Sequence, residues 1–250
     1  MVISEPFEVE FDEGRHHRAK IGFVLLATEQ TIEDDMYHLL PDGIGIHFTR
    51  TPIPDSITAE TLTDLADSLG DAAALLLPDG SLDVITYGCT SGSLVVGEDR
   101  VFKELNSGAP SALTTSLITS VLRALAVIDA KRVVVATPYL DEINQMEKEY
   151  MEARGFEVLN IQGLNLEKDS DMVRVTPQSL LRFAESLDQP DADAIFISCG
   201  ALRSIDIIEE LERRTGKPVI TSNQAMAWDV LRLAGIEDRV EGYGVLLREY

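Results

Sequence analysis

The chain has 250 residues, and its 45% hydrophobic content is enough for the core of one large or two small domains. It carries 43 acidic against 21 basic residues, a formal net charge of −22, which disfavours nucleic acids and acidic membranes as partners. Because no apolar run reaches the roughly 20 residues of a membrane span and no signal-peptide core is present, we expect a cytoplasmic protein whose acidity favours solubility at high salt.

Predicted strands and helices alternate along the whole chain. In the first half, apolar runs predict strands at 21–27, 44–48 and 83–88, and helical periodicity covers 32–40, 58–77, 93–105 and 114–128. In the second half, the strands are predicted at 133–136, 157–161, 194–198 and 219–221, and the helices at 141–154, 177–187, 204–215 and 223–233. This alternation is typical of parallel sheets covered by helices on both faces, and therefore of the α/β class.

The two halves also resemble each other in detail. The helical stretch 120–126 recurs at 229–235, an offset of 109 residues, and the two cysteines of the chain, Cys89 and Cys199, lie 110 residues apart. Leu- and Arg-rich helices can look alike through composition alone. Several landmarks at one offset nevertheless favour a duplicated α/β unit.

Each cysteine lies where an apolar run gives way to small residues, which in a parallel sheet is the carboxyl end of a strand. Ligands bind at that edge, and two facing thiols there could exchange protons with one substrate. A following helix N-terminus would favour a bound carboxylate and lower the pKa of the thiol. The alternative for either cysteine is an ordinary buried small apolar residue, because free cysteine is commonly buried.

Several other chemistries find no support in the sequence. The chain contains no Gly-x-Gly-x-x-Gly and no Walker lysine loop, and the glycine spacing around Cys89 is wrong for a serine nucleophile elbow. The four histidines (His16, His17, His38 and His47) are not at zinc-ligand spacing with a cysteine. We therefore expect a protein without cofactor or metal.

Four motifs, at 87–92, 136–144, 197–203 and 218–225, together resemble the aspartate/glutamate racemase superfamily. The similarity covers about residues 20–243 and is greatest to the branch of maleate cis–trans isomerases, arylmalonate decarboxylases and ectoine-utilisation proteins. It implies two pseudo-symmetric lobes, each a parallel, flavodoxin-like four-stranded sheet flanked by helices, with the active site in the cleft between them. We expect residues 1–115, completed by 224–250, to form lobe 1 with Cys89, and 116–223 to form lobe 2 with Cys199.

The resemblance also implies roles for individual residues. It places Cys89 and Cys199 on opposite faces of a small carboxylate substrate, with a homo-oligomer possible. The groups that it implies for binding the substrate carboxylate are Thr90, Ser91, Tyr139 and the Gly200 backbone.

The loop 28–31 after the first strand, which begins with Thr28, corresponds to a substrate-contacting segment, and Asn223 starts a helix near the cleft. A helix cap is an equal alternative for Thr28, Asn223 and Ser93. Asp169 aligns with an asparagine that binds the far carboxylate of the substrate in the family. A carboxylate at this position would repel a dianion and would suit an amino or amide group, as in the ectoine-utilisation members. If the alignment shifts to Asn165, a maleate-like substrate is restored.

Three functions remain open at this point. A cofactor-independent isomerase or racemase needs both cysteines, because one thiolate removes a proton or adds to a double bond while the other thiol acts from the opposite face. An arylmalonate-type decarboxylase needs only Cys199 as the proton donor. A non-catalytic protein that binds small carboxylates would need neither thiol.

Overall fold

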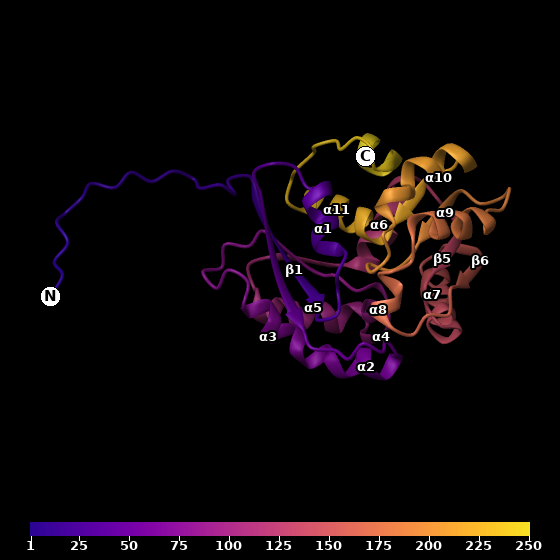
Figure 1. Ribbon diagram of the computed structural model, residues 1–250, viewed down its shortest axis with the longest axis horizontal. Coiled ribbons are helices and arrows are strands. Elements are labelled where there is room, and N and C mark those ends of the chain that lie inside the picture. Colours follow the sequence, from indigo (N-terminus) through magenta and orange to yellow (C-terminus); the bar gives the residue numbers. More distant parts are fainter.

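The computed structural model describes residues 1–250 and contains two parallel four-stranded sheets with helices on their faces (Figure 1). The strand orders are β2-β1-β3-β4 and β6-β5-β7-β8, so the second half repeats the topology of the first. This repeat confirms the predicted pair of pseudo-symmetric α/β units. The strands are β1 (Ala19–Leu26), β2 (Ile44–Thr51), β3 (Val84–Tyr87), β4 (Leu113–Ser116), β5 (Arg132–Thr137), β6 (Glu157–Gly163), β7 (Ala194–Ile197) and β8 (Val219–Thr221).

The helices connect successive strands and cover the sheets. They are α1 (Ile32–Leu39), α2 (Ala59–Asp64), α3 (Leu69–Ala74), α4 (Thr90–Val96), α5 (Glu98–Gly108), α6 (Leu117–Val127), α7 (Asp141–Glu152), α8 (Asp169–Met172), α9 (Pro177–Ser186), α10 (Ile208–Thr215), α11 (Ser222–Leu233) and α12 (Gly244–Glu249), with short 3₁₀ turns at Leu65–Ser68 and Ile205–Ile207. None of them is long and apolar enough to cross a membrane.

The two halves share one hydrophobic core. Strands β3, β7 and β8 are buried along their whole length, as expected for parallel strands covered on both faces. The larger apolar cluster contains 52 buried residues drawn from both sheets, including Phe23 of β1 and Phe196 of β7. The halves are therefore held together by a continuous apolar interior.

Several segments differ from the sequence-based expectation. Residues 114–116, which were expected to open a helix, belong to β4, and the helix begins only at Leu117. The helix expected at 93–105 is two helices, α4 and α5, separated by Gly97 with a φ of 85°. That backbone conformation is cheap only for glycine, so the sequence itself permits the break.

Helix α11 bridges the two sheets, whereas α12 packs on the second. Helix α11 packs against α6 and α1 and contacts β3 and β4 of the first sheet and β8 of the second, and α12 packs against β8 and α10. The division of the chain into lobes at 115/116, with 224–250 completing lobe 1, stays a prediction. At the other end of the chain, residues 1–14 are exposed and extend away from the body of the molecule (Figure 1).

Candidate functional site

Cys89 follows the end of β3 and caps the N-terminus of α4. Its Sγ accepts a hydrogen bond from the Gly92 N–H at 3.2 Å and lies 3.6 Å from the Ser91 hydroxyl. The side chain is 7% exposed. Its φ of −142° is ordinary extended backbone, so this thiol is held in place without backbone strain.

Cys199 occupies the equivalent place after β7 in the second sheet. Its φ is 99°, in the left-handed region that residues other than glycine rarely adopt. The Cys199 N–H donates to the Ser222 hydroxyl at 3.0 Å, and this contact helps to hold the unusual backbone. Strained backbone of this kind is often found at functional positions.

Both thiols open onto one small pocket. Five of the residues expected to bind substrate also line it: Thr90, Ser91, Tyr139, Asp169 and Gly200. The remaining lining residues are Leu26, Glu29, Ile57, Gly88, Met172 and Ala201. The pocket therefore lies at the carboxyl ends of strands from both sheets, where ligands bind in α/β proteins.

Thr28 and Asn223 lie just behind the pocket lining. The Thr28 hydroxyl donates to Asp169 Oδ2 at 2.5 Å, and Asn223 Nδ2 donates to the Gly200 carbonyl at 2.8 Å and to Asp35 Oδ2 at 2.7 Å. Neither residue is a helix cap, because Thr31 and Thr221 occupy the cap positions of α1 and α11. Thr28 and Asn223 thus hold groups that line the pocket.

Ser93 has a similar supporting place. It is fully buried within α4, and its hydroxyl donates to the Cys89 carbonyl at 2.6 Å. The helix-cap alternative is therefore wrong for Ser93 as well, since the N-cap of α4 is Cys89 itself.

Ser222 links the two cysteine loops. Its hydroxyl accepts from the Cys199 N–H and shares a 3.0 Å hydrogen bond with the Thr90 hydroxyl, which lies next to Cys89 in sequence. Ser222 is fully buried at the start of α11. A single side chain thus links a loop of the first sheet to a loop of the second. The motif at 218–225 contains Ser222, but the sequence did not show this role.

Glu29 is the one charged lining residue that the sequence reasoning did not single out. It is 5% exposed, and its Oε1 accepts from the backbone N–H groups of Gln30, Thr31 and Ile32 at the start of α1. Burial raises its pKa to about 7, with a further contribution from the charge of Asp169. The resemblance marks the loop 28–31 that contains Glu29, but in a chain with 43 acidic residues nothing in the sequence distinguishes this glutamate from the others.

Both thiols have raised pKa values. Burial raises the pKa of Cys89 to about 11 despite the Ser91 and Gly92 donors, and it raises the pKa of Cys199 well above the ordinary thiol value. The negative charge of Asp169 adds to both shifts. The expectation of a helix-lowered thiol pKa is therefore wrong, because burial and a nearby carboxylate outweigh the helix N-terminus.

Tyr139 supports the second thiol. It follows β5 and Pro138, is 3% exposed, and donates its backbone N–H to the Thr137 hydroxyl at 3.1 Å. The phenol beside Cys199 partly offsets the rise in the pKa of that thiol. No group of three or more His, Cys, Asp or Glu side chains is arranged to hold a metal ion.

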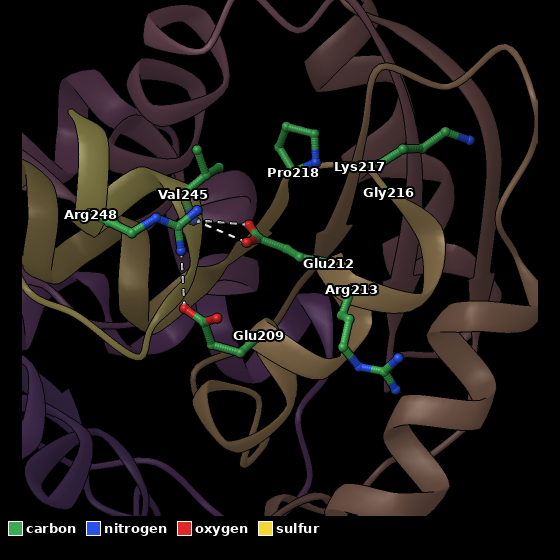
Figure 2. A pocket seen from close by; sticks show the side chains of 8 residues that line it. All are labelled: Glu209, Glu212, Arg213, Gly216, Lys217, Pro218, Val245 and Arg248. Carbon is green, nitrogen blue, oxygen red and sulfur yellow. Dashed lines mark hydrogen bonds and ion pairs between the residues drawn. The ribbon is translucent and has the colours of Figure 1, made fainter.

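A second, more open hollow of about 700 Å³ lies at the amino end of β8 (Figure 2). Its charged groups largely satisfy one another, because Arg248 pairs with Glu209 at 3.2 Å and Glu212 accepts from the Val245 N–H at 3.1 Å. It contains no cysteine, and it lies at the edge of the sheet opposite to the thiols. The pocket between the cysteines is thus the stronger candidate site.

Comparison with known proteins gives a consistent family. The sequence profile of the arylmalonate decarboxylase family matches residues 34–247. The maleate isomerase of Nocardia farcinica is 28% identical over 92% of this chain and 96% of its own length. The arylmalonate decarboxylase of Bordetella bronchiseptica has the same identity and the same coverage of both chains.

Solved structures of such enzymes are similar over nearly the whole chain. Nocardia farcinica maleate cis-trans isomerase bound to TRIS superposes with a TM-score of 0.86 at 26% identity, covering 92% of this chain and 98% of that one. A cysteine-to-serine mutant of that enzyme with a covalently bound succinylcysteine intermediate gives a TM-score of 0.85 at 26% identity, covering 93% and 99%.

Proposed function

The chain belongs to the arylmalonate decarboxylase family, and from this premise we propose that it is a cofactor-independent isomerase, either a cis–trans isomerase or a racemase, acting on a small carboxylate. Cys89 and Cys199 are the proposed catalytic residues. The observation that carries the proposal is that two thiols from loops 110 residues apart open onto one pocket. A pair of this kind can transfer protons or add to a substrate without further groups.

The cis–trans route is supported by the relative whose solved structure contains a succinylcysteine intermediate. In this route the Cys89 thiolate forms a bond to one alkene carbon while the Cys199 thiol gives its proton to the other. The resulting single bond rotates. Return of that proton to Cys199 and cleavage of the carbon–sulfur bond then yield the trans isomer and the starting thiolate.

The racemase route uses the same two groups for proton transfer alone. One thiolate removes the proton from the carbon next to the carboxylate, and the opposite thiol delivers a proton to the other face. In both routes negative charge develops on the substrate carboxylate. The hydroxyls of Thr90 and Ser91 and the Gly200 backbone are the proposed groups that stabilise this charge.

Deprotonation of the thiols is energetically unfavourable in this pocket, because both thiol pKa values are raised. Burial raises the pKa of Cys89 to about 11, so the thiol rather than the thiolate predominates at neutral pH in the empty pocket. Binding of the substrate must therefore favour the thiolate, either by shielding Asp169 or by bringing positive charge near the sulfur. We expect the reaction rate to rise with pH through the neutral range for this reason.

Proton NMR in D₂O tests the proposal. The enzyme is incubated with maleate, with α-amino and N-acetylamino acids, and with phenylmalonate, and each signal is followed over hours. We expect either fumarate or the loss of one α-proton signal, abolished in both Cys89→Ala and Cys199→Ala. Turnover that survives either substitution in a folded variant would contradict the two-thiol mechanism, and silence across the mixture would favour a binding protein.

Decarboxylation is the second candidate, and the family profile and the Bordetella bronchiseptica relative favour it. In that reaction Cys199 alone protonates the enediolate left by carbon dioxide. Phenylmalonate would then be consumed, and Cys89→Gly would retain activity whereas Cys199→Ala would not. The presence of a second thiol in the pocket makes isomerisation our preferred proposal.

The setting that we propose is cytoplasmic. Both cysteines are free and buried, and a catalytic mechanism that depends on two reduced thiols suits a reducing compartment.

A further inference from the structure

Residues 1–14 form an extended arm with one apolar face. Phe7, Val9 and Phe11 are 88%, 57% and 91% exposed, and they belong to neither apolar cluster of the protein. Acidic residues alternate with them, namely Glu8, Glu10 and Asp12. This period of two gives an extended segment one apolar and one acidic face, as in a strand that lies at the boundary of a core. Large apolar side chains gathered on one exposed face indicate a surface that contacts a partner.

The arm is directed away from its own chain. Gly14 has a φ of 75°, its N–H donates to Asp12 Oδ1 at 2.8 Å, and a turn follows at Arg15 and His16. Beyond this turn the arm leads away from the body of the molecule (Figure 1). Fully extended, the 14 residues of the arm span about 45 Å. The arm is therefore long enough, and suitably directed, to reach a second molecule.

Strand β2 combines an open sheet edge with an apolar patch. It is the last strand of the first sheet and pairs only with β1, and such an edge can accept a further strand. Ile46 and Phe48 of β2 are half-buried. Tyr37 of α1 is 64% exposed, and its ring centroid lies 6.1 Å from that of Phe48. We call Ile46, Phe48 and Tyr37 the β2 patch.

The opposite face of β2 is basic. His47 lies on that face because it alternates with the patch residues along the strand, and its ring meets that of His16 with centroids 5.3 Å apart. Burial lowers the pKa of His47, and the charges of His16 and Lys20 lower it further, so Lys20 is also close to this face. His47 Nε2 is buried without a hydrogen-bond partner. A strand with one apolar and one acidic face therefore matches β2 on both sides.

We propose that the arm of one molecule adds as a strand to the β2 edge of a second copy of this chain. The apolar face of the arm then covers the β2 patch, and its acidic face lies towards His16, His47 and Lys20. Backbone hydrogen bonds hold such an added strand, and the alternating side chains give it specificity. Because every molecule has both an arm and a β2 edge, the exchange is reciprocal and produces a two-fold symmetric dimer.

The contact is large enough for a stable dimer. A buried aromatic side chain covers roughly 150–250 Å². The two phenylalanines in each of two exchanged arms, together with the surface that they cover, bury on the order of 1,500 Å². Specific protein interfaces commonly bury roughly 1,200–2,000 Å². Two exchanged arms thus supply the area of a standard interface.

Sedimentation velocity over a concentration series tests the exchange. We expect the native chain to sediment as a dimer and the double variant Phe7→Ser with Phe11→Ser to dissociate at a concentration at least about a hundredfold higher. Both phenylalanines are exposed in the single molecule, so their replacement leaves the fold intact. The matched control is Leu113→Ser, which removes another exposed apolar side chain from β4, at the opposite edge of the same sheet. It should sediment like the native chain.

A mixing experiment tests the acceptor. Tyr37→Asp keeps the arm but places a carboxylate in the β2 patch, and it should be monomeric alone. Mixed with the double arm variant, it should form dimers in which its intact arm occupies the intact patch of the other molecule.

A monomeric native chain, or an arm variant as dimeric as the native chain, would overturn the exchange. A Tyr37→Asp variant that dimerises like the native chain, or a mixture that stays monomeric, would overturn β2 as the acceptor. A monomeric native chain that binds a different protein through the arm would count against a second copy in the same way.

Discussion

Cys199 adopts a backbone conformation that glycine would adopt more easily. Its φ is 99°, whereas the equivalent Cys89 has an ordinary φ of −142°. We therefore expect Cys199→Gly to be about 1 kcal/mol more stable than Cys199→Ala, since alanine keeps the steric clash and glycine removes it. Urea unfolding of the two variants measures this difference.

Cys89 supplies the matched control. Cys89 has an ordinary extended φ, so glycine relieves no steric clash there and loses more backbone entropy on folding than alanine. Cys89→Gly should therefore be less stable than Cys89→Ala. If alanine were the more stable substitution at both positions, the backbone conformation of Cys199 would not measurably destabilise the protein.

Glu147 makes the stability of the protein depend on pH. It is fully buried, its Oε1 accepts from Ser198 at 2.7 Å, and burial raises its pKa from 4.5 to about 7. The folded state therefore keeps a proton that the unfolded state releases between about pH 4.5 and pH 7, so this group destabilises the fold as pH rises through that window.

Glu147→Gln should remove this contribution. We expect the loss of unfolding free energy between pH 4.5 and pH 8 to shrink by about 3 kcal/mol in the variant, because burial raises the pKa of Glu147 from 4.5 to about 7. Urea unfolding at several pH values gives the two curves. Parallel curves for variant and native protein would mean that Glu147 is already ionised in the folded state.

The sequence motifs predicted the pocket residues that directly follow apolar strands. Cys89 and Cys199 follow apolar strands, and a family motif marked Tyr139, so their arrival in one pocket is predictable from strand ends. Glu29 and Ser222 lie in the marked segments 28–31 and 218–225, but their own roles were not predicted, because nothing in an amino-acid sequence distinguishes a buried polar side chain from an exposed one. Their partners lie on backbone groups and loops that only the folded chain brings together.

The Asp229 carboxylate connects helix α11 to the first half of the molecule. Asp229, 2% exposed, accepts from the hydroxyls of Thr115 at 2.6 Å and Ser120 at 2.9 Å and from Arg123 at 3.1 Å. These groups come from β4 and α6. Because α11 also carries Ser222, the anchor positions the link between the two cysteine loops.

Asp229→Ala should therefore destabilise the protein by about 3 kcal/mol, because two buried hydroxyls and a half-exposed guanidinium lose their acceptor. Chemical denaturation measures the change. The control is Glu152→Ala, which removes an exposed pair with Lys148 at 3.7 Å and should change stability by less than about 0.5 kcal/mol. Equal effects would show that the Asp229 contacts add little.

The elements that the sequence predicted poorly are the short ones. Strand β4 has four residues, too few to show a period of two, and its β-branched Thr114 and Thr115 were absorbed into the helical pattern that follows. The long pattern over 58–77 likewise broke into α2, a 3₁₀ turn and α3. In both places the helical pattern ran across the boundary between neighbouring short elements.

For the whole molecule, charge repulsion opposes folding. Acidic residues exceed basic ones by 22, far more than the ion pairs on the surface can balance. The Debye length falls from about 10 Å at 0.1 M salt to about 3 Å at 1 M, so salt should relieve this repulsion more than it weakens individual pairs. The free energy of unfolding therefore increases with ionic strength.

We expect the thermal midpoint to rise on the order of 5 °C between 0.1 M and 1 M NaCl. Differential scanning calorimetry measures it. Potassium chloride is the control, since simple screening gives the same shift with either cation. A midpoint that is constant or falls would mean that the ion pairs outweigh the net repulsion.

Ser222 connects the Cys199 loop to Thr90, so enzymatic activity depends on the contact between the two halves of the molecule. Turnover requires the two halves to keep their native relative position. Each half can retain most of its own helices if the two halves separate. In a urea titration, catalysis should therefore disappear at a lower denaturant concentration than the helical circular dichroism signal. Coincident loss would show that the halves unfold as one unit. An early loss would make enzymatic activity a more sensitive reporter of the junction than any spectroscopic signal of secondary structure.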